Sequence, residues 1–247
     1  MIRDRRSAVF SATALAVIAC TALSGFAQPA FAGDRASAGS QVAGVRPATA
    51  KSASSLPGLG PKTLAAVPQS TSQALVVTGN GVSSATGHAV LYHRVGNGWV
   101  ADGSWATHNA LDGWTHNHHD RDLHTPIGVF SLTDAGGYLP SPGGKLPYYR
   151  SKYFTVAGSG FEGEPLAGSF DYVVAINYNR VPGRSPLDET QPLGPAKGGG
   201  IWLHVDHGGP THGCVSLPRA AMIQLLRSLD PAMHPVVVMG DAADLKQ

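Results

Sequence analysis

The sequence is poor in cysteine, in charge and in long apolar segments, and each shortage excludes a class of protein. Its 247 residues include two cysteines, and charged residues make up 14% of the chain. The formal net charge is +2 and no basic cluster alternates with aromatic residues, so nothing predicts a nucleic-acid-binding protein. None of the lysines has a serine three residues before it, which excludes the Ser-x-x-Lys serine enzymes. The apolar run from about Ala8 to Ala19 is too short for a membrane anchor.

The first 32 residues have the features of a secretory signal peptide. Three arginines within the first six residues precede the apolar run, and residues 30–32 form an A-x-A cleavage site before Gly33. We therefore expect an exported protein, secreted or associated with the cell wall. Residues 17–20 form an alternative, lipoprotein-type site with Cys20 as the lipidated residue. In both cases Cys214 is left as the only free thiol of the mature chain, which excludes an internal disulfide and suggests reactivity.

Composition divides the rest of the chain into a linker and one domain. Residues 33–66 are rich in Ala, Ser, Gly and Pro, so we expect a linker without a core of its own. Residues 67–247 suffice for one mainly β domain, an antiparallel sandwich or barrel, with a helix predicted over Pro218–Leu229. The runs that predict strands are Ala74–Val77, Ala89–His93, Gly98–Ala101, Gly128–Leu132, Tyr153–Val156, Tyr172–Ile176, Ile201–His204 and Val236–Met239.

Residues 201–217 combine features that activate a thiol. A buried strand over the first residues would end at His204, and the Gly-Gly-Pro turn that follows would return the chain to Cys214, ten positions later. An imidazole within hydrogen-bond reach is the usual means of making a thiolate near neutral pH. Gly213 lets a carbonyl approach closely, and its N–H and that of Cys214 could form an oxyanion hole. The pattern predicts acyl transfer through a thioester.

The same residues resemble a known family. Thr211-His212-Gly213-Cys214-Val215 is similar to the [Ser/Thr]-His-Gly-Cys-apolar signature of the L,D-transpeptidase (YkuD-like) catalytic domain, and His204 matches that family's upstream base. Residues 125–130, Thr-Pro-Ile-Gly-Val-Phe, are similar to the family's Thr-Pro-x-Gly-x-Phe turn and strand, so the resemblance spans roughly residues 70–240. The spacing from His204 to Cys214 is short, which indicates a short-loop branch. The resemblance implies a mainly antiparallel β domain with one helix after the cysteine.

The resemblance also implies an activity. Cys214 would attack an L,D-peptide bond of a peptidoglycan stem peptide and expel D-alanine, with His204 as the base. The acyl group would pass to an amine, or to water in an L,D-carboxypeptidase. We expect a monomer that needs no cofactor, and a pI near 8.6 suits residence near an anionic cell wall. The expected supporting residues are Thr211, His212 and Gly213, and those expected at the substrate are Tyr178, Asn179 and Ser216.

Two other interpretations stay open. One is a zinc hydrolase that uses His116, His118, His119 and His124 or the incomplete His-x-Asp-His pattern at residues 204–207. We expect the histidine cluster to be a solvated loop instead, and we assign no metal. The other is a non-catalytic cell-wall-binding module with a degenerate site. Cell-wall cysteine hydrolases in which the histidine follows the cysteine are disfavoured by the order of the residues.

Overall fold

The structure, a computed structural model, describes residues 52–247. The expected signal peptide, the alternative lipidation site at Cys20 and the first part of the expected linker lie outside the described residues. In chain order the elements are α1 (Pro61–Ala66), β1 (Gln73–Gly79), β2 (Thr86–Val95), β3 (Gly98–His108), β4 (Trp114–Thr115), β5 (Thr125–Pro126), β6 (Gly128–Gly137), β7 (Tyr148–Arg150), β8 (Val173–Ile176), a 3₁₀ turn (Pro195–Lys197), β9 (Trp202–Val205), β10 (Val215–Leu217), α2 (Arg219–Ser228), a second 3₁₀ turn (Pro231–Met233), β11 (Val236–Asp241) and α3 (Ala242–Leu245).

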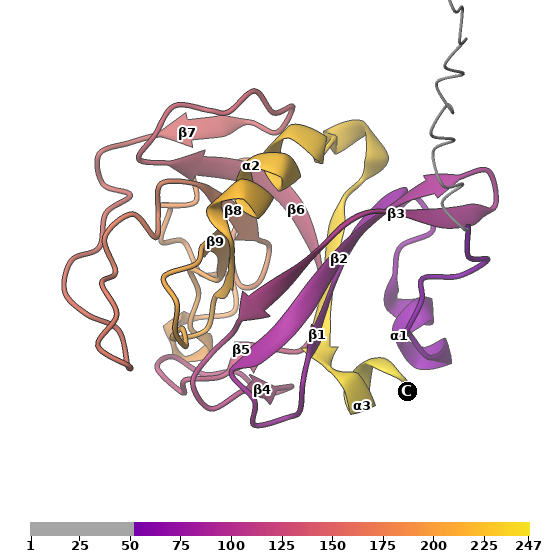
Figure 1. Cartoon of the computed structure of the whole chain (residues 1–247), viewed down its shortest axis with the longest axis horizontal. Helices are drawn as coiled ribbons and strands as arrows, with labels where there is room; N and C mark the ends of the chain where they lie inside the picture. Colours follow the sequence, from indigo (N-terminus) through magenta and orange to yellow (C-terminus); the bar gives the residue numbers. More distant parts are fainter. Residues whose placement is uncertain (1–51) are drawn as a thin grey trace, which may run out of the picture. The chain divides into compact units, whose positions relative to one another are not determined.

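Nine strands form one sheet that closes into a barrel (Figure 1). Their order is β11-β1-β2-β3-β10-β9-β8-β6-β7, and β6 also pairs with β11. Closure is possible because β6 is long: its first half pairs with β11, where Phe130 faces Val237, and its second half pairs with β8 and β7. Most neighbours are antiparallel, but β9 and β10 run parallel, as do β1 and β11. The predicted mainly β domain is confirmed, in its barrel form.

The helix after the cysteine fills the core from one side. α2 runs from Arg219 to Ser228, as the spacing of its apolar residues predicts. Its buried residues Met222, Leu225 and Leu226 join the main apolar cluster, which the inward residues of the strands complete. Complete burial of one such side chain contributes roughly 1.5–3 kcal/mol, so α2 anchors β9, which it contacts, as well as itself.

A second apolar cluster shows that the ordered chain begins before residue 67. Leu56 is 1% exposed and packs against the outward residues of β1 and β11, which explains why these strands are buried on both faces. Leu64 of α1 and Leu245 of α3 belong to the same cluster. Residues 52–66, which we expected to belong to a linker, therefore pack on the barrel. Composition misses this because a few leucines in a Gly/Pro/Ser-rich stretch suffice to anchor it.

One predicted strand is absent from the described part of the chain. Residues 153–156 form no strand but belong to a long loop between β7 and β8. Phe154 in this loop is buried, and its ring centroid lies 5.8 Å from that of Trp202 on β9. Phe154 thus anchors the loop over the sheet, whereas Tyr153 and Thr155 are exposed, so the predicted strand was wrong.

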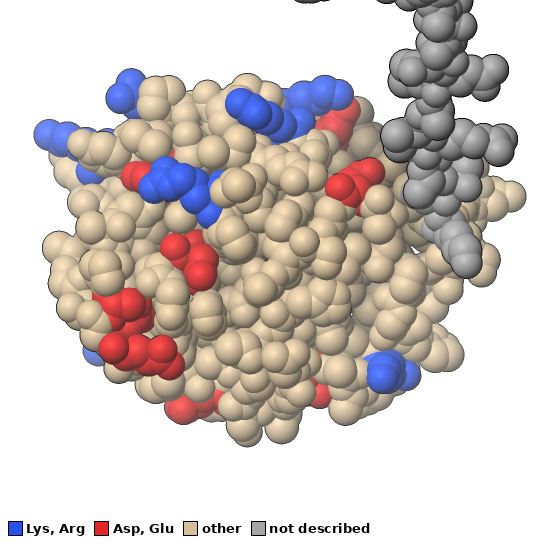
Figure 2. Space-filling model, in the orientation of Figure 1, with Lys and Arg blue, Asp and Glu red and all other residues tan. Residues whose placement is uncertain are grey.

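Charge is sparse on the face of the domain drawn in Figure 2. Lys and Arg side chains on this face lie mostly in its upper half, near α2 and β7, and also near α1 and α3, and Asp and Glu side chains are scattered, some of them beside Lys or Arg. In residues 52–247, no helix combines the length and the apolar character needed to cross a bilayer.

Candidate active site

Cys214 immediately precedes β10, and His204 belongs to β9, the neighbouring parallel strand. His204 lies in β9, and its direct partner across β10 is Ser216. Residues that face each other across a strand pair, and residues two apart along a strand, point to the same side of the sheet. Cys214 and His204 therefore share one face, while Leu203 and Val215 point to the core on the other. By this register Cys214 and His204, the predicted nucleophile and base, lie on the same side of the sheet.

The His204 ring is buried and held in one tautomer. His204 is 3% exposed, and its Nδ1 lies 2.9 Å from the carbonyl oxygen of Val205. Because a carbonyl can only accept, Nδ1 carries the proton and Nε2 keeps a free lone pair. Burial lowers the pKa of His204 and so does the nearby His207, the Val205 carbonyl and Asp206 oppose the shift, and the resulting pKa is about 4. The ring is thus neutral near pH 7 and able to accept a proton.

The Cys214 thiol is protonated at rest. Its sulfur lies 3.4 Å from the Trp202 N–H, and the thiol donates to the Gly200 carbonyl at 3.5 Å. Burial raises the pKa of Cys214 to about 11, although the Trp202 N–H opposes this. Among the described residues, no hydrogen bond joins the thiol to His204. The thiol therefore keeps its proton near neutral pH, and hydrogen bonds between catalytic groups are often longer in a site without substrate than in the reacting one.

Thr211 fixes the turn that presents the thiol. It is 3% exposed, its hydroxyl donates to the Cys214 carbonyl at 2.6 Å, and the same hydroxyl accepts the Gly213 N–H at 3.3 Å. Within residues 52–247, the Cys214 N–H has no backbone acceptor, so it is free for an oxyanion. His212 is exposed at the rim, and its ring centroid lies 4.6 Å from that of Phe161.

Ser216 is not placed to touch a substrate. It is fully buried, and its hydroxyl donates to Oδ1 of Asp206 at 2.7 Å. Nδ1 of His108 lies 2.8 Å from the same oxygen. Desolvation raises the pKa of Asp206, but the bonds from Ser216 and His108 outweigh it and the net pKa is lowered. The expected contact between Ser216 and substrate is thus corrected: the residue bonds β10 to the end of β9.

The tip of the β7–β8 loop, residues 158–166, packs on the turn formed by residues 206–214, which we call the catalytic turn. Nδ1 of His207 lies 3.1 Å from Oε1 of Glu164, and the His207 ring stacks on that of His204, with centroids 5.8 Å apart and planes 10° apart. Phe161 covers His212 from the same tip. Sequence reasoning assigned His207 to an ordinary polar turn and missed Glu164, since nothing in the sequence links residues 43 positions apart.

A cavity of about 160 Å³ opens in front of the thiol. Its lining includes Cys214, Gly213 and His212 from the catalytic turn, together with His118 from the histidine cluster. His118 is 5% exposed, whereas His116 and His119 are exposed. The expectation of a solvated loop therefore fails for His118, which the ring of Tyr178 and its neighbours enclose.

The histidine cluster does not converge on a common point. Nε2 of His116 lies 3.1 Å from Asp244, and Nδ1 of His118 lies 2.9 Å from Asp122. In the part of the chain that the structure describes, no group of three or more His, Cys, Asp or Glu side chains is arranged to hold a metal ion. The zinc interpretation therefore has no set of ligands among these residues.

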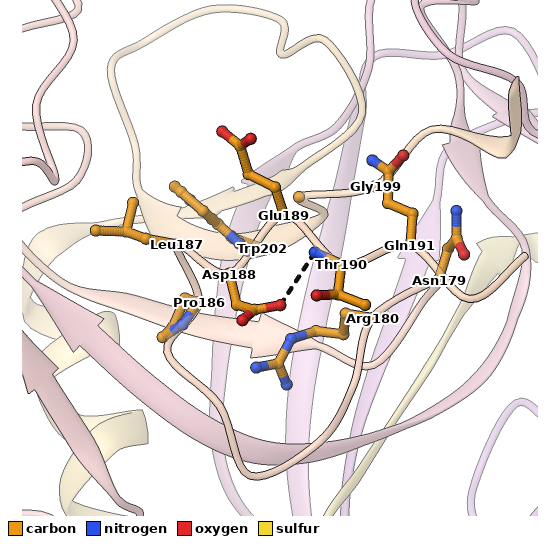
Figure 3. Close-up of a pocket in the computed structure, with 11 residues that line it drawn as sticks. Asn179, Arg180, Pro186, Leu187, Asp188, Glu189, Thr190, Gln191, Gly199 and Trp202 are labelled. Atoms are coloured by element: carbon orange, nitrogen blue, oxygen red, sulfur yellow. Dashed lines mark hydrogen bonds between the residues drawn. The ribbon is translucent and has the colours of Figure 1, made fainter. Parts of the chain in front are cut away.

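A larger cavity of about 390 Å³ adjoins the first (Figure 3). Gly199 and Gly200 line both, and Trp202, whose N–H contacts the thiol, lies between them. Asn179 lines this cavity, and its amide donates to the Gly194 and Gly198 carbonyls.

Tyr178 does not line either cavity but supports the first one. Its hydroxyl donates to the Lys197 carbonyl at 2.8 Å, and the His118 carbonyl lies 3.3 Å from the same oxygen. Of the residues expected at the substrate, Asn179 lines the larger cavity, Tyr178 supports the wall of the smaller one, and Ser216 is buried.

Known sequence families and solved structures include some that are similar to this chain. The sequence model of the L,D-transpeptidase catalytic domain (YkuD) matches residues 71–238. No curated protein sequence matches. A solved structure, that of Bd1075 from Bdellovibrio bacteriovorus, is similar at 14% sequence identity and a TM-score of 0.38, over 76% of this chain and 53% of that one. The chain thus spans about half the length of that protein, and the likeness is too weak to carry a conclusion.

Proposed function

Because the chain belongs to the L,D-transpeptidase catalytic domain (YkuD) family, we propose that it is an exported cysteine acyltransferase that acts on peptidoglycan stem peptides. Members of this family are L,D-transpeptidases with a cysteine nucleophile, and they act on peptidoglycan. What is proposed for this chain is the thioester on Cys214, the role of His204, and the place of action. Export is supported by the features of residues 1–32.

In the first half-reaction the thiol attacks the carbonyl of an L,D-peptide bond. The sulfur of Cys214 forms a bond to the carbonyl carbon, and its proton passes to Nε2 of His204. The free N–H of Cys214 donates a hydrogen bond to the negatively charged carbonyl oxygen. The Gly213 N–H donates to it as well if it gives up its bond to the Thr211 hydroxyl. The C–N bond then breaks, the leaving D-alanine takes the proton from His204, and a thioester remains.

The observation that carries the proposal is the tautomer of His204. A thiol of pKa about 11 needs an acceptor nitrogen, and the Val205 carbonyl leaves Nε2 of His204 as that acceptor. Its position on the face that carries Cys214 comes from the register of β9 and β10. A binding module would need neither a neutral imidazole on this face nor an orphan N–H at the cysteine.

Trapping the thioester tests the proposal. The domain is incubated with a tetrapeptide stem and its intact mass is followed, with Cys214→Ala as the control. We expect a mass increase equal to the stem peptide minus D-alanine, absent from the variant. Addition of an amine acceptor separates cross-linked product from the trimmed peptide that water would give. A protein that binds stem peptides without forming any adduct or product would be a binding module instead.

A further inference from the structure

We propose that His118 is a second acid–base residue of this site, which takes the proton of the acceptor amine while His204 serves the thiol. The inference rests on the proposed acyl transfer at Cys214. It gives a function to one histidine of the cluster at residues 116–124 and assigns the two half-reactions to different imidazoles.

The position of His118 is the first argument. Together with Cys214 it lines the cavity in front of the thiol, and His204 is not among the described residues that line it. Its ring lies between two backbone segments of the wall: a Cβ on Gly213 would be 3.7 Å from Cε1, and one on Gly198 would be 3.0 Å from Nε2. An acceptor that enters this cavity meets His118, whereas the buried ring of His204 is not among the described residues that line it.

The way His118 is held is the second argument. Its side chain is 4% exposed, and Nδ1 lies 2.9 Å from Oδ1 of Asp122, at an angle too bent for a regular hydrogen bond. The ring also meets Tyr178 edge to face, with centroids 5.3 Å apart. A carboxylate behind one ring nitrogen favours the tautomer that leaves the other nitrogen free to accept.

The loop that carries His118 adds a third argument. Asp122 ties it together by accepting the N–H groups of His119 at 2.8 Å and of His124 at 3.0 Å. Arg121 and Leu123 have φ values of 61° and 56°, a left-handed conformation that is unfavourable for a residue with a β-carbon. Strain of this kind persists where the surroundings impose it, and it gathers at functional sites. Here the two strained residues belong to the loop that places the buried His118 ring at the thiol cavity.

His204 is poorly placed for the second half-reaction. It is 3% exposed, and the ring of Phe170 stands against it edge to face at 5.4 Å. His212 lines the cavity but is exposed and packs on Phe161. His118 combines access to the cavity with a fixed orientation, and burial, opposed by Asp122, leaves its pKa lowered, so the ring is neutral near pH 7.

The step balances without another reactant. The lone pair of the amine forms the C–N bond at the thioester carbonyl, and the proton that the nitrogen must lose passes to Nε2 of His118. The C–S bond breaks with its electrons on sulfur. The imidazolium then returns the proton to the thiolate, and an amide and a free thiol remain.

The test follows the two half-reactions separately. The protein is acylated with p-nitrophenyl acetate, whose release of p-nitrophenol reports acylation of Cys214, and glycinamide is then added as the amine. For His118→Gln we expect acylation within about threefold of wild type and aminolysis of the acetyl-enzyme slower by about 100-fold or more, so that the acetyl-enzyme accumulates in intact mass spectra. His119→Gln, which changes an exposed neighbour, should match wild type in both steps.

A second variant guards against misfolding. In His118→Ala, free imidazole should restore aminolysis, which a merely structural defect would not allow. The inference is overturned if aminolysis in His118→Gln keeps the wild-type rate, or if both half-reactions fall together and imidazole rescues neither. Because p-nitrophenyl acetate does not resemble a stem peptide, failure of the proposed substrate leaves this test intact. If no acyl donor labels the wild-type thiol, both the proposed thioester at Cys214 and the proposed role of His118 are contradicted.

Discussion

Ser216 lies directly opposite His204 across a pair of parallel strands, and this places Cys214 and His204 on one face of the barrel. Parallel neighbours cannot be joined by a simple hairpin, so the chain must cross back over the sheet between them. Residues 206–214 make that crossing, and Cys214 sits at its end, just before β10. Ten positions in sequence are sufficient because His204 lies in β9 and Cys214 immediately precedes the adjacent β10.

Removal of the nucleophile should end turnover and leave the fold. For Cys214→Ala we expect no detectable product from stem peptides. The free energy of unfolding should change by less than about 1 kcal/mol, because the thiol is partly exposed and its two hydrogen bonds are long. Product analysis by mass and urea unfolding measure the two effects. Retained activity would contradict the mechanism.

The pH dependence of stability should report on His204. Its pKa is about 4 in the folded protein and near 6.5 when unfolded, so below pH 6.5 the unfolded chain binds more protons. Stability from this group is therefore complete above pH 6.5 and is lost as the pH falls toward 4. The full difference is about 3 kcal/mol. Urea unfolding at pH 7 and pH 4.5 should show a smaller loss in His204→Gln than in wild type, and equal losses would contradict the assignment.

The hydroxyl of Thr211 should matter more for rate than for binding. Thr211→Val keeps the shape but removes the bonds to the Cys214 carbonyl and the Gly213 N–H. We expect kcat to fall by about tenfold or more with little change in KM, since a buried unmade hydrogen bond costs roughly 1–3 kcal/mol. Thr211→Ser is the matched control and should stay close to wild type. Equal rates for the Val and Ser variants would show that the hydroxyl has no part in the turn.

Chelation and alkylation should separate thiol from metal chemistry. A chelator should leave activity unchanged, whereas iodoacetamide should abolish it with one label on the mature chain, at Cys214. Peptide mapping locates the label. Activity that a chelator removes and zinc restores would instead support the hydrolase interpretation.

The N-terminus of the mature protein tests export and processing. We expect it to begin at Gly33, after the A-x-A site, and intact mass of protein recovered from culture or wall decides this. A chain that begins at a diacylglyceryl-modified Cys20 and partitions into detergent would be membrane-tethered, and the secreted form would be wrong.

Local sequence patterns carried the parts of the fold and site that depend on local chemistry. The Thr-x-Gly-Cys turn and the strand that ends near His204 are each one continuous stretch of sequence, so their residues predict them directly. The spacing of the apolar residues in α2 predicts that helix in the same way. His118 could not be found in this way, because its burial depends on Tyr178, sixty positions away, and its neighbours are polar. Phe154 misled for the opposite reason: its apolar character serves a loop that covers the sheet.

The last strand of the chain is also the one that closes the barrel. β11 lies between β1, the first strand, and β6, so until residues 236–241 are available two strand edges stay open. Residues 60–62 also need the C-terminal residues for their packing, because the backbone N–H groups of Gly60 and Lys62 donate to the carbonyls of Leu245 and Gln247. Without residues 236–241, the edges of β1 and β6 that pair with β11 would be unpaired. Truncation by a dozen residues would leave exposed edges prone to aggregation rather than a smaller working enzyme.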